Sequence, residues 1–381
     1  MNKAIFMMAA AAITLASCSS DETTDVAKSS QISFTAKVGK NSRGAETTTA
    51  NLLGMWVTGY DITKADAPTV YFADQEFKKD ANSQFLPDTP WYWQAGKSYR
   101  FIGIHPAKAD WKGTLDIAAD QVTYQAQIPT AIADQKDLII DAVTGTDAQA
   151  TTGVKMDFQH ILSQLQFKVK SESKHLTYHI AGIRIVNADS KGSFSFNTKD
   201  RTGNWAEQTS DKVTYEMLFK DSPIELTTGK TEAFLTPENS GAMIVPQKLT
   251  PWDGNVVTTA APYDNGAYIA LLINVKYNNG TYLYPGKAQN TTDYGWVAVP
   301  VSPATGGTQA IWSMGNKYIY TLDLTKGCGK VDPQYPNLPD GGVVDPGGKD
   351  PEPGANIFGK AIFFTVTVAG WGNGFSSDIN M

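Results

Sequence analysis

The chain has 381 residues, of which 11% are aromatic and 18% are charged, and its formal net charge at pH 7 is −6. A slightly acidic chain of this kind lacks the basic surface of a nucleic-acid-binding protein, so we expect no nucleic-acid partner. Its length is sufficient for two domains that are each stable through a hydrophobic core of their own.

Residues 1–17 have the features of a secretory signal peptide. Lys3 precedes an apolar run that is too short to span a bilayer, and small residues follow directly before Cys18. The Leu-Ala-Ser-Cys sequence at residues 15–18 resembles a bacterial lipoprotein signal. This resemblance implies cleavage before Cys18, acylation of Cys18 with chains such as palmitate, and anchoring in the outer membrane. The alternative is an ordinary signal peptide with a chance cysteine.

The next residues and the cysteine count extend this interpretation. The polar and acidic residues 19–22 resemble the tag that sends lipoproteins of the Bacteroidetes to the cell surface. Cys18 and Cys328 are the only two cysteines, so acylation of Cys18 leaves no intrachain disulfide. We expect Cys328 to be an unpaired surface thiol and assign it no role.

Segments with an apolar residue at every second position recur along the chain and predict β-strands. The clearest are residues 31–38, 98–104, 165–170, 192–197, 268–277 and 317–324. Turn signals such as Asn-Asn-Gly and Asp-Asn-Gly separate them, and long amphipathic helical patterns are nearly absent. We therefore predict an all-β fold with two β-sandwiches, divided within the small polar residues 144–153.

The chain changes character after Leu324. Residues 331–356 are so rich in proline and glycine that we expect an extended linker without a packed core, reaching beyond the second sandwich. The apolar alternation then returns at residues 361–371, AIFFTVTVAGW. We expect this last strand to have no partner strand within its own subunit. Its residues on one face are Ile362, Phe364, Val366 and Val368.

The strand at residues 32–38, ISFTAKV, has the same pattern as the last strand. Isoleucine, phenylalanine, threonine and valine recur at the same spacing, so the two strands fit one groove. The general similarity of β-strands is the alternative explanation of the match. The residues of the first strand that correspond to the apolar face are Ile32, Phe34, Ala36 and Val38.

Residues 39–49 follow this first strand as a loop of small polar residues and contain Arg43, the first arginine of the chain. Exposed loops of this composition are preferred sites of proteolysis. An Arg-specific protease that cuts between Arg43 and Gly44 would release the lipid anchor together with the first strand. The remaining apolar groove would have unpaired backbone groups, which a strand from another subunit would fill by β-augmentation. The alternative is that Arg43 is a solvated loop residue.

Several segments, in order and spacing, resemble the fimbrillin family, the subunits of the protease-assembled (type V) pili of the Bacteroidetes. The resemblance covers nearly the whole chain. It implies two tandem transthyretin-like β-sandwiches, export as a lipoprotein, cleavage after an arginine, and polymerisation by a C-terminal strand that enters the next subunit. Its marks beyond the lipoprotein signal are Ser42-Arg43-Gly44, PWYWQAGKSYRFIGIHP (90–106), VKMDFQHILSQLQFKV (154–169), MIVPQKL (243–249), WSMGNKYIYTLDL (312–324) and FFTVTVAGW (363–371).

Carried onto this chain, the resemblance implies a fimbrial subunit that is surface-exposed at the outer membrane and enters the fimbrium after maturation. The implied partners are other fimbrial subunits, an Arg-specific protease, the outer membrane through the lipid, and host or bacterial surface glycans. The expected segments are the signal peptide (1–17), the lipidated propeptide with the displaced strand (18–43), the N-terminal sandwich (44–150), the C-terminal sandwich (151–330), the linker (331–356) and the donor-strand segment (357–381).

The search for catalytic motifs points to no enzyme. No nucleophile elbow, zinc-protease motif or phosphate-binding glycine loop is present, so we expect no cofactor and no metal. His175 and His179 are four residues apart on a predicted strand, too far for easy shared metal binding, and we expect them at a surface or edge. His160 is expected to be a hydrogen-bonded residue within the fold.

Adhesion is the alternative to a polymerising stalk subunit. A tip adhesin would present clustered, exposed tryptophan rings, whereas a stalk subunit would bury them. A third alternative is a sugar-binding surface lipoprotein that does not polymerise. The non-polymerising lipoprotein would also keep its first strand and leave Arg43 uncut. The tryptophans in question are Trp56, Trp91, Trp93, Trp111, Trp205, Trp252, Trp296 and Trp312.

Overall fold

The computed structural model confirms the expected all-β class. The regular elements in the described part are strands and three short 3₁₀ helices, and none of its helices is long and apolar enough to cross a membrane. The 3₁₀ helices are η1 (Lys108–Asp110), η2 (Ile132–Asp134) and η3 (Asp147–Gln149). The described residues are 31–39, 47–206, 211–236, 241–254, 266–301, 310–334, 342–358, 362–370 and 377–379.

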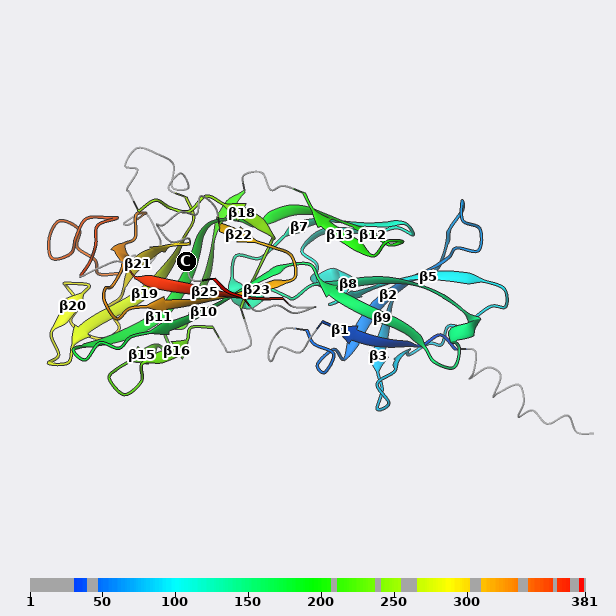
Figure 1. The fold of residues 1–381 in the computed structure, drawn as a ribbon, viewed down its shortest axis with the longest axis horizontal. Coiled ribbons are helices and arrows are strands. Elements are labelled where there is room, and N and C mark those ends of the chain that lie inside the picture. Colours follow the sequence, from blue (N-terminus) through cyan, green and yellow to red (C-terminus); the bar gives the residue numbers. More distant parts are fainter. Residues whose placement is uncertain are drawn as a thin grey trace, which may run out of the picture.

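The N-terminal part forms a closed barrel with the strand order β1-β4-β3-β2-β5-β8-β9 (Figure 1). Its strands are β1 (Phe34–Val38), β2 (Gly54–Asp61), β3 (Thr69–Lys79), β4 (Phe85–Pro87), β5 (Ser98–His105), β8 (Ile139–Thr146) and β9 (Val154–His160). Apolar residues alternate along β9, so one face fills the barrel and the other faces solvent. At the centre, the Phe34 ring lies edge-on to Phe77 at 4.8 Å and to Phe101 at 5.1 Å.

Two sheets pack face to face in the C-terminal part. The first contains β10 (Ser163–Lys170), β16 (Glu232–Phe234), β17 (Ala242–Ile244), β23 (Asn316–Asp323), β25 (Phe363–Gly370) and β26 (Ser377–Ile379). The second contains β11 (Leu176–Asp189), β14 (Lys212–Leu218), β15 (Ile224–Leu226), β19 (Tyr268–Tyr277), β20 (Tyr282–Tyr284), β21 (Gly295–Pro300) and β24 (Lys330–Val331). Phe167 and Tyr320 of the first sheet share one core with Ile183 and Leu271 of the second.

A four-stranded sheet joins the two parts (Figure 1). In it β7 pairs with β12, although the two strands come from different halves of the chain. Val122 of β7 and Ile102 of β5 belong to the same core as the C-terminal sandwich, so the barrel is buried on that side. The strands are β6 (Gly113–Ile117), β7 (Gln121–Gln127), β12 (Lys191–Asn197) and β13 (Thr202–Trp205); β18 (Gln247–Leu249) pairs with β22 (Ala310–Trp312) nearby.

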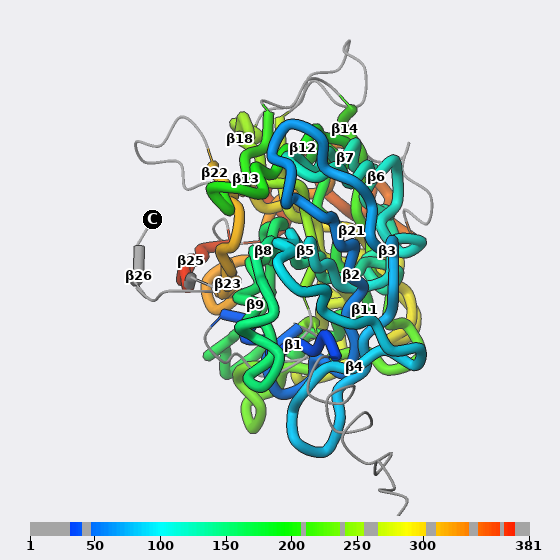
Figure 2. Tube along the Cα trace, turned by 90° about the vertical axis from the view of Figure 1, so that its right-hand side faces the viewer, coloured from blue at the N-terminus to red at the C-terminus, as the bar shows by residue number. Residues whose placement is uncertain are grey.

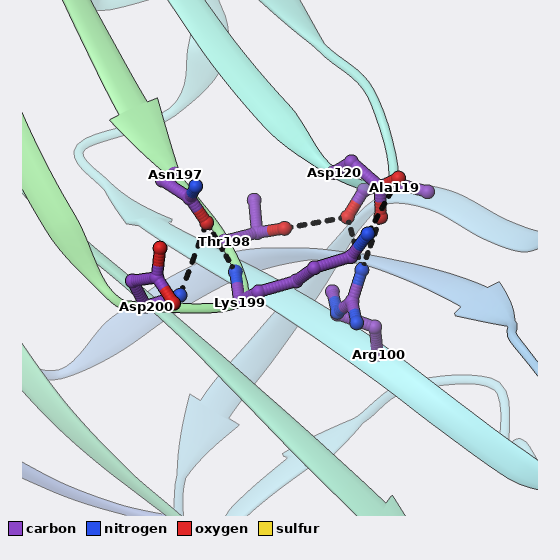
Figure 3. A network of polar contacts seen from close by, with 7 residues as sticks. All are labelled: Arg100, Ala119, Asp120, Asn197, Thr198, Lys199 and Asp200. Carbon is purple, nitrogen blue, oxygen red and sulfur yellow. Dashed lines mark hydrogen bonds and ion pairs between the residues drawn. The ribbon is translucent and has the colours of Figure 1, made fainter. Parts of the chain in front are cut away.

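A polar network fixes this sheet to the barrel (Figure 3). Arg100, buried on β5, donates to the backbone oxygen of Ala119 at 3.0 Å and also contacts the Asp120 carboxylate. Thr198 donates to the same oxygen at 2.6 Å, and the Lys199 ammonium lies 3.0 Å from Asp120. The loops that connect β6 to β7 and β12 to β13 are therefore held to one barrel strand.

The structure differs from the expected domain boundary near residue 150. β9 follows that point in sequence, yet it pairs with β1 and β8 and closes the barrel. The sequence also predicted an open two-sheet sandwich for the N-terminal part, whereas the strands of this part form one closed barrel. The small polar residues 144–153 comprise the end of β8 and the turn from β8 to β9, two adjacent barrel strands.

The expectation of an extended linker at residues 331–356 is wrong for the described residues of this segment. Asp332 is fully buried, and its carboxylate accepts a hydrogen bond from the Tyr268 hydroxyl at 2.8 Å. The Asp350 carboxylate, also buried, accepts from the backbone of Gly286 at 2.7 Å. Residues 331–334 and 342–358, here called the strap, therefore pack on the C-terminal sandwich. Asp332 and Asp350 anchor the strap to the sandwich. The proline and glycine content, on which the prediction of a linker rested, does not indicate these contacts.

Cys328 also differs from expectation. Its thiol is unpaired but fully buried in the C-terminal core, and burial raises its pKa to about 12. The segment that carries it lies beneath the strap, which covers what the sequence suggested was a surface.

Candidate functional site

The first strand, β1, closes the barrel between β9 and β4, as the view from the barrel end shows (Figure 2). It runs parallel to β9 along its whole length, from Phe34 opposite Val154 to Val38 opposite Phe158. On its other side it pairs with β4 at a single position, Phe34 opposite Phe85. β1 thus forms a full ladder of backbone pairs with β9, whereas its edge toward β4 is almost unpaired.

The alternation expected for the first strand is present. Ile32, Phe34 and Val38 are buried in the barrel core, and Ala36 packs against that core while partly exposed. Removal of this strand would expose the rings that surround Phe34 and leave the edge of β9 without hydrogen-bond partners.

Hydrogen bonds hold both ends of the first strand. At its beginning, the Ile32 amide donates to the backbone oxygen of Trp91 at 2.7 Å. At its end, the Val38 amide donates to the Thr49 hydroxyl oxygen at 2.9 Å, and that hydroxyl donates to the Val38 oxygen at 3.1 Å. Thr49 thereby fixes the strand to the chain beyond the expected cleavage bond.

A buried polar group fixes the chain just after that bond. The Thr47 amide donates to Asp137 Oδ2 at 2.8 Å, and Asp137 Oδ1 lies 3.0 Å from His160 Nδ1. All three residues are buried, so the carboxylate is satisfied from both sides. We call Thr47, Asp137 and His160 the clamp. His160 is hydrogen-bonded within the fold, as predicted, whereas no sequence signal pointed to Asp137 as its partner.

The other expected maturation residues lie outside the described part of the chain. These are Cys18, Arg43 and Gly44. Thr47 is the first described residue after the expected cleavage bond, and Gly39 is the last before it. Lipidation and cleavage at these positions stay predictions.

The last strand, β25, has a partner within its own subunit, so the expectation that it has none is wrong. It pairs antiparallel with β23, from Phe363 opposite Asp323 to Gly370 opposite Asn316. Burial of its alternate residues against the sandwich supplies the reason. Ile362, Phe364 and Val366 are buried, Val368 is partly buried, and Phe363 on the opposite face is 56% exposed.

β25 nevertheless lies near the edge of its sheet. Among the described residues, only the short β26 pairs with its outer side, at Val366 to Val368. The strand can therefore detach without the loss of a ladder on the far side over most of its length. The structure brings the two candidate strands to different parts of the molecule, β1 in the barrel and β25 in the C-terminal sandwich.

Sites for metals or sugars find little support in the described residues. No group of three histidine, cysteine, aspartate or glutamate side chains is placed to hold a metal there. A cavity of about 410 Å³ lies between β13, β18 and β22 and includes Trp205 and Trp312 in its lining. Both indole N–H groups are already used: Trp205 donates to the Ile161 oxygen at 2.6 Å and Trp312 to the Tyr320 hydroxyl at 2.9 Å.

The tryptophans considered from the sequence are all buried or partly buried. Among described residues the exposed aromatic side chains are Tyr92, Phe358 and Phe363. No cluster of exposed tryptophan rings occurs in this part of the chain. His179 lies on β11 with Nε2 at 3.8 Å from Glu225, and burial lowers the pKa of the imidazole.

Comparison with solved structures finds several that this chain resembles. A fimbrial protein from Bacteroides vulgatus superimposes with a TM-score of 0.50 at 14% identity, over 90% of this chain and 99% of that chain. A candidate cell adhesion protein from Bacteroides uniformis gives a TM-score of 0.42 at 15% identity, over 78% of this chain and 93% of that chain. A candidate cell adhesion protein from Parabacteroides distasonis gives a TM-score of 0.41 at 9% identity, over 90% of this chain and 100% of that chain.

No protein with a curated description matches the chain. A family profile does: that of the fimbrillin-like proteins matches residues 42–335. This match begins at the expected cleavage loop and extends through the barrel and the C-terminal sandwich to the start of the strap. Because it covers most of the sequence, the chain belongs to the fimbrillin-like family.

Proposed function

We propose that the protein is a structural subunit of cell-surface fimbriae that supports adhesion and polymerises by donor-strand exchange. In this proposal the precursor is exported as a lipoprotein anchored at the outer membrane through Cys18. An Arg-specific protease cuts between Arg43 and Gly44, and the first strand leaves the barrel. The C-terminal strand of another copy then takes its place.

The pairing of the first strand is the observation that carries this proposal. β1 is a core strand of the barrel, yet it forms a full ladder with β9 only and pairs with β4 at one position, and the expected cleavage loop directly follows it. A cut there converts the strand from a tethered segment into a separate peptide. The barrel would then have a groove lined by Phe77 and Phe101, with an open ladder on β9.

The C-terminal strand matches that groove in its side chains. Ile362, Phe364 and Val368 correspond to Ile32, Phe34 and Val38, and Val366 replaces the smaller Ala36. Burial of each large apolar side chain contributes roughly 1.5–3 kcal/mol. The donor would thus restore the apolar burial that the first strand contributed. Val366 would add buried apolar area at the position of Ala36.

The donor strand is already buried in its own sandwich, so its transfer exchanges one groove for another with a small net change. Affinity alone therefore does not give the exchange a direction. Cleavage supplies it, because a covalent tether holds the first strand at a high effective concentration, and this is lost once the loop is cut. Before cleavage, pairing of β25 with β23 shields the apolar strand from unwanted association.

A stalk subunit is favoured over a tip adhesin or a sugar-binding lipoprotein. The tryptophans of the described residues are at least partly buried, and the indole N–H groups of Trp205 and Trp312 have internal partners. Host or bacterial glycans are therefore proposed as targets of the assembled fimbria, with no sugar site assigned to this subunit.

A peptide-capture experiment tests the proposal. Subunit produced from Ser19 onward is cut at Arg43 and mixed with a fluorescent peptide of residues 361–371. We expect the cut subunit to bind the peptide and the uncut subunit not to bind it. A matched peptide with Phe364→Asp and Val366→Asp should fail, because it would bury charge without a partner. Equal binding of both peptides would contradict donor-strand exchange.

A further inference from the structure

We propose that consecutive subunits dock directly, with the surface around Phe358 of one copy against an aromatic rim on the barrel of the next. The rim consists of Tyr71, Trp91 and Tyr92. This inference rests on the proposed strand exchange and adds to it the identity of the contact surface. The occupant of the rim is a second copy of this chain.

The length of the tether between the strap and the donor strand is the first argument. The Ile357 amide donates to the Gly329 oxygen at 3.1 Å, and the Cys328 amide to the Phe358 oxygen at 3.4 Å. The strap is thus fixed to its own sandwich up to Phe358. Only residues 359–361 separate it from Ile362, and a fully extended chain over this interval spans about 13 Å.

The position of the donor in the next barrel is the second argument. The sequence match places Ile362 where Ile32 lies, with both strands running in the same direction. The Ile32 amide donates to the Trp91 oxygen, and Gln31 forms a bridge with Tyr92. A donor strand in this place would bring the Phe358 of its own subunit to within about 13 Å of the Trp91 segment. A long flexible linker before the donor strand would allow consecutive subunits to lie apart. Because the strap is packed on its own sandwich up to Phe358, the two subunits must lie close together.

The chemistry of the two surfaces is the third argument. Tyr92 and Phe358 are each 43% exposed, in a chain whose other described aromatic side chains, apart from Phe363, are more buried. The Tyr71 hydroxyl donates to the Tyr92 oxygen at 2.7 Å, and the Tyr71 ring lies 5.3 Å from that of Trp91. A rigid aromatic surface that meets an exposed phenylalanine has the composition of a protein–protein contact.

A donor strand of opposite direction would predict a different contact. Ile362 would then lie at the Val38 end of the groove, near the turn that contains Thr49. That turn carries Leu53, which is 69% exposed. Leu53 therefore provides a matched control position at the opposite end of the same strand.

Chemical cross-linking distinguishes the two ends. Full-length subunit from Ser19 onward carries either Tyr92→Cys with Phe358→Cys, or Leu53→Cys with Phe358→Cys. After cleavage and assembly, a short bismaleimide is added and the products are boiled in denaturant. We expect covalent dimers and higher oligomers from the Tyr92 pair only. The native Cys328 is buried and should give no background.

The outcomes separate this inference from the proposed function. A heat-sensitive ladder in which the Leu53 pair alone, or neither pair, is cross-linked would overturn the interface while leaving strand exchange intact. Absence of any ladder would overturn strand exchange and the interface with it. As a second measurement, Tyr92→Asp should slow assembly about tenfold, as expected for a central aromatic contact, with the melting temperature of the uncut monomer unchanged. An unchanged assembly rate would also overturn the interface.

Discussion

The backbone amide of Thr47 donates a hydrogen bond to the carboxylate of Asp137 at 2.8 Å, and both residues are buried. Thr47 is the first described residue after the expected cleavage bond. Because the same carboxylate contacts His160 on β9, the chain at Thr47 is fixed to the barrel independently of β1. In the proposed maturation, the cut subunit would therefore lose its first strand without the release of the residues that follow.

Substitution of Asp137 tests the clamp. Asp137→Ala leaves the buried Thr47 amide and the His160 ring without their acceptor, which should lower the free energy of unfolding by about 1–3 kcal/mol. Urea denaturation of the uncut subunit measures this change. Asp134→Ala, three residues earlier on an exposed position, is the matched control and should be neutral. Equal midpoints for the two variants would show that the clamp does not stabilise the fold.

The size of residue 36 should set the rate of strand exchange. Ala36→Val gives the first strand the residue that the donor has at this place and strengthens its burial by about 1 kcal/mol. Release of the strand after cleavage should then slow about fivefold. The rate of assembly is measured from samples that are quenched at successive times after cleavage and run on unboiled gels. Thr35→Val, on the opposite face of β1, should leave it unchanged, and equal slowing by both variants would argue against a side-chain effect in the groove.

The strap should make stability depend on pH through Asp332. Burial raises the pKa of this carboxyl to about 6 in the folded chain, although hydrogen bonds from Gln334 and Tyr268 oppose the shift. The folded state therefore binds the proton more tightly than the unfolded state. The associated stability is present below the ordinary aspartate pKa of about 3.9 and is lost as the pH rises through about 6.

Thermal unfolding from pH 4 to 7 checks this dependence. Asp332→Asn should flatten the decline in stability over that interval, while Asp66→Asn, at an exposed position, should retain it. Asp141 keeps part of the slope in both variants, because burial also raises its pKa to about 6. A slope in Asp332→Asn equal to that of the parent would contradict the assignment.

Cys328 should be unreactive in the folded subunit. Its thiol is buried, and burial raises its pKa to about 12, so very little thiolate exists at neutral pH. Mass spectrometry after treatment with a maleimide should show no adduct until the chain is unfolded in denaturant. The exposed cysteine of a Tyr92→Cys variant provides the positive control. Rapid labelling of Cys328 in the folded chain would mean that the strap opens readily.

Local patterns predicted the strands well. The alternation in ISFTAKV and IFFTVTV identified six of the eight predicted apolar-face residues as buried, because side chains of a strand point to opposite faces in turn. Ala36 and Val368 are only partly buried, and Ser33 on the opposite face is buried. The pattern did not predict where each strand pairs. The partner of β25 is β23, and the closing partner of β1 is β9, which follows the expected domain boundary. Such pairings depend on long-range register that no single segment encodes.

The strap and the clamp were harder to predict for the same reason. Proline and glycine content favours an open linker, but the burial of Asp332 depends on Tyr268, far away in sequence. Nothing near Asp137 in the sequence links it to Thr47. Single polar residues that bridge distant segments leave no periodic signal. They were therefore found only in the folded structure.

The most direct test of the central claim uses the subunit from Ser19 onward before and after limited cleavage by an Arg-specific protease. The products are run on an unboiled denaturing gel, and the N-terminus is sequenced. The account predicts a heat-sensitive ladder with a new terminus at Gly44, and neither in the variant Arg43→Ala. A subunit that is cut at Arg43 yet remains a monomer would contradict polymerisation by donor-strand exchange.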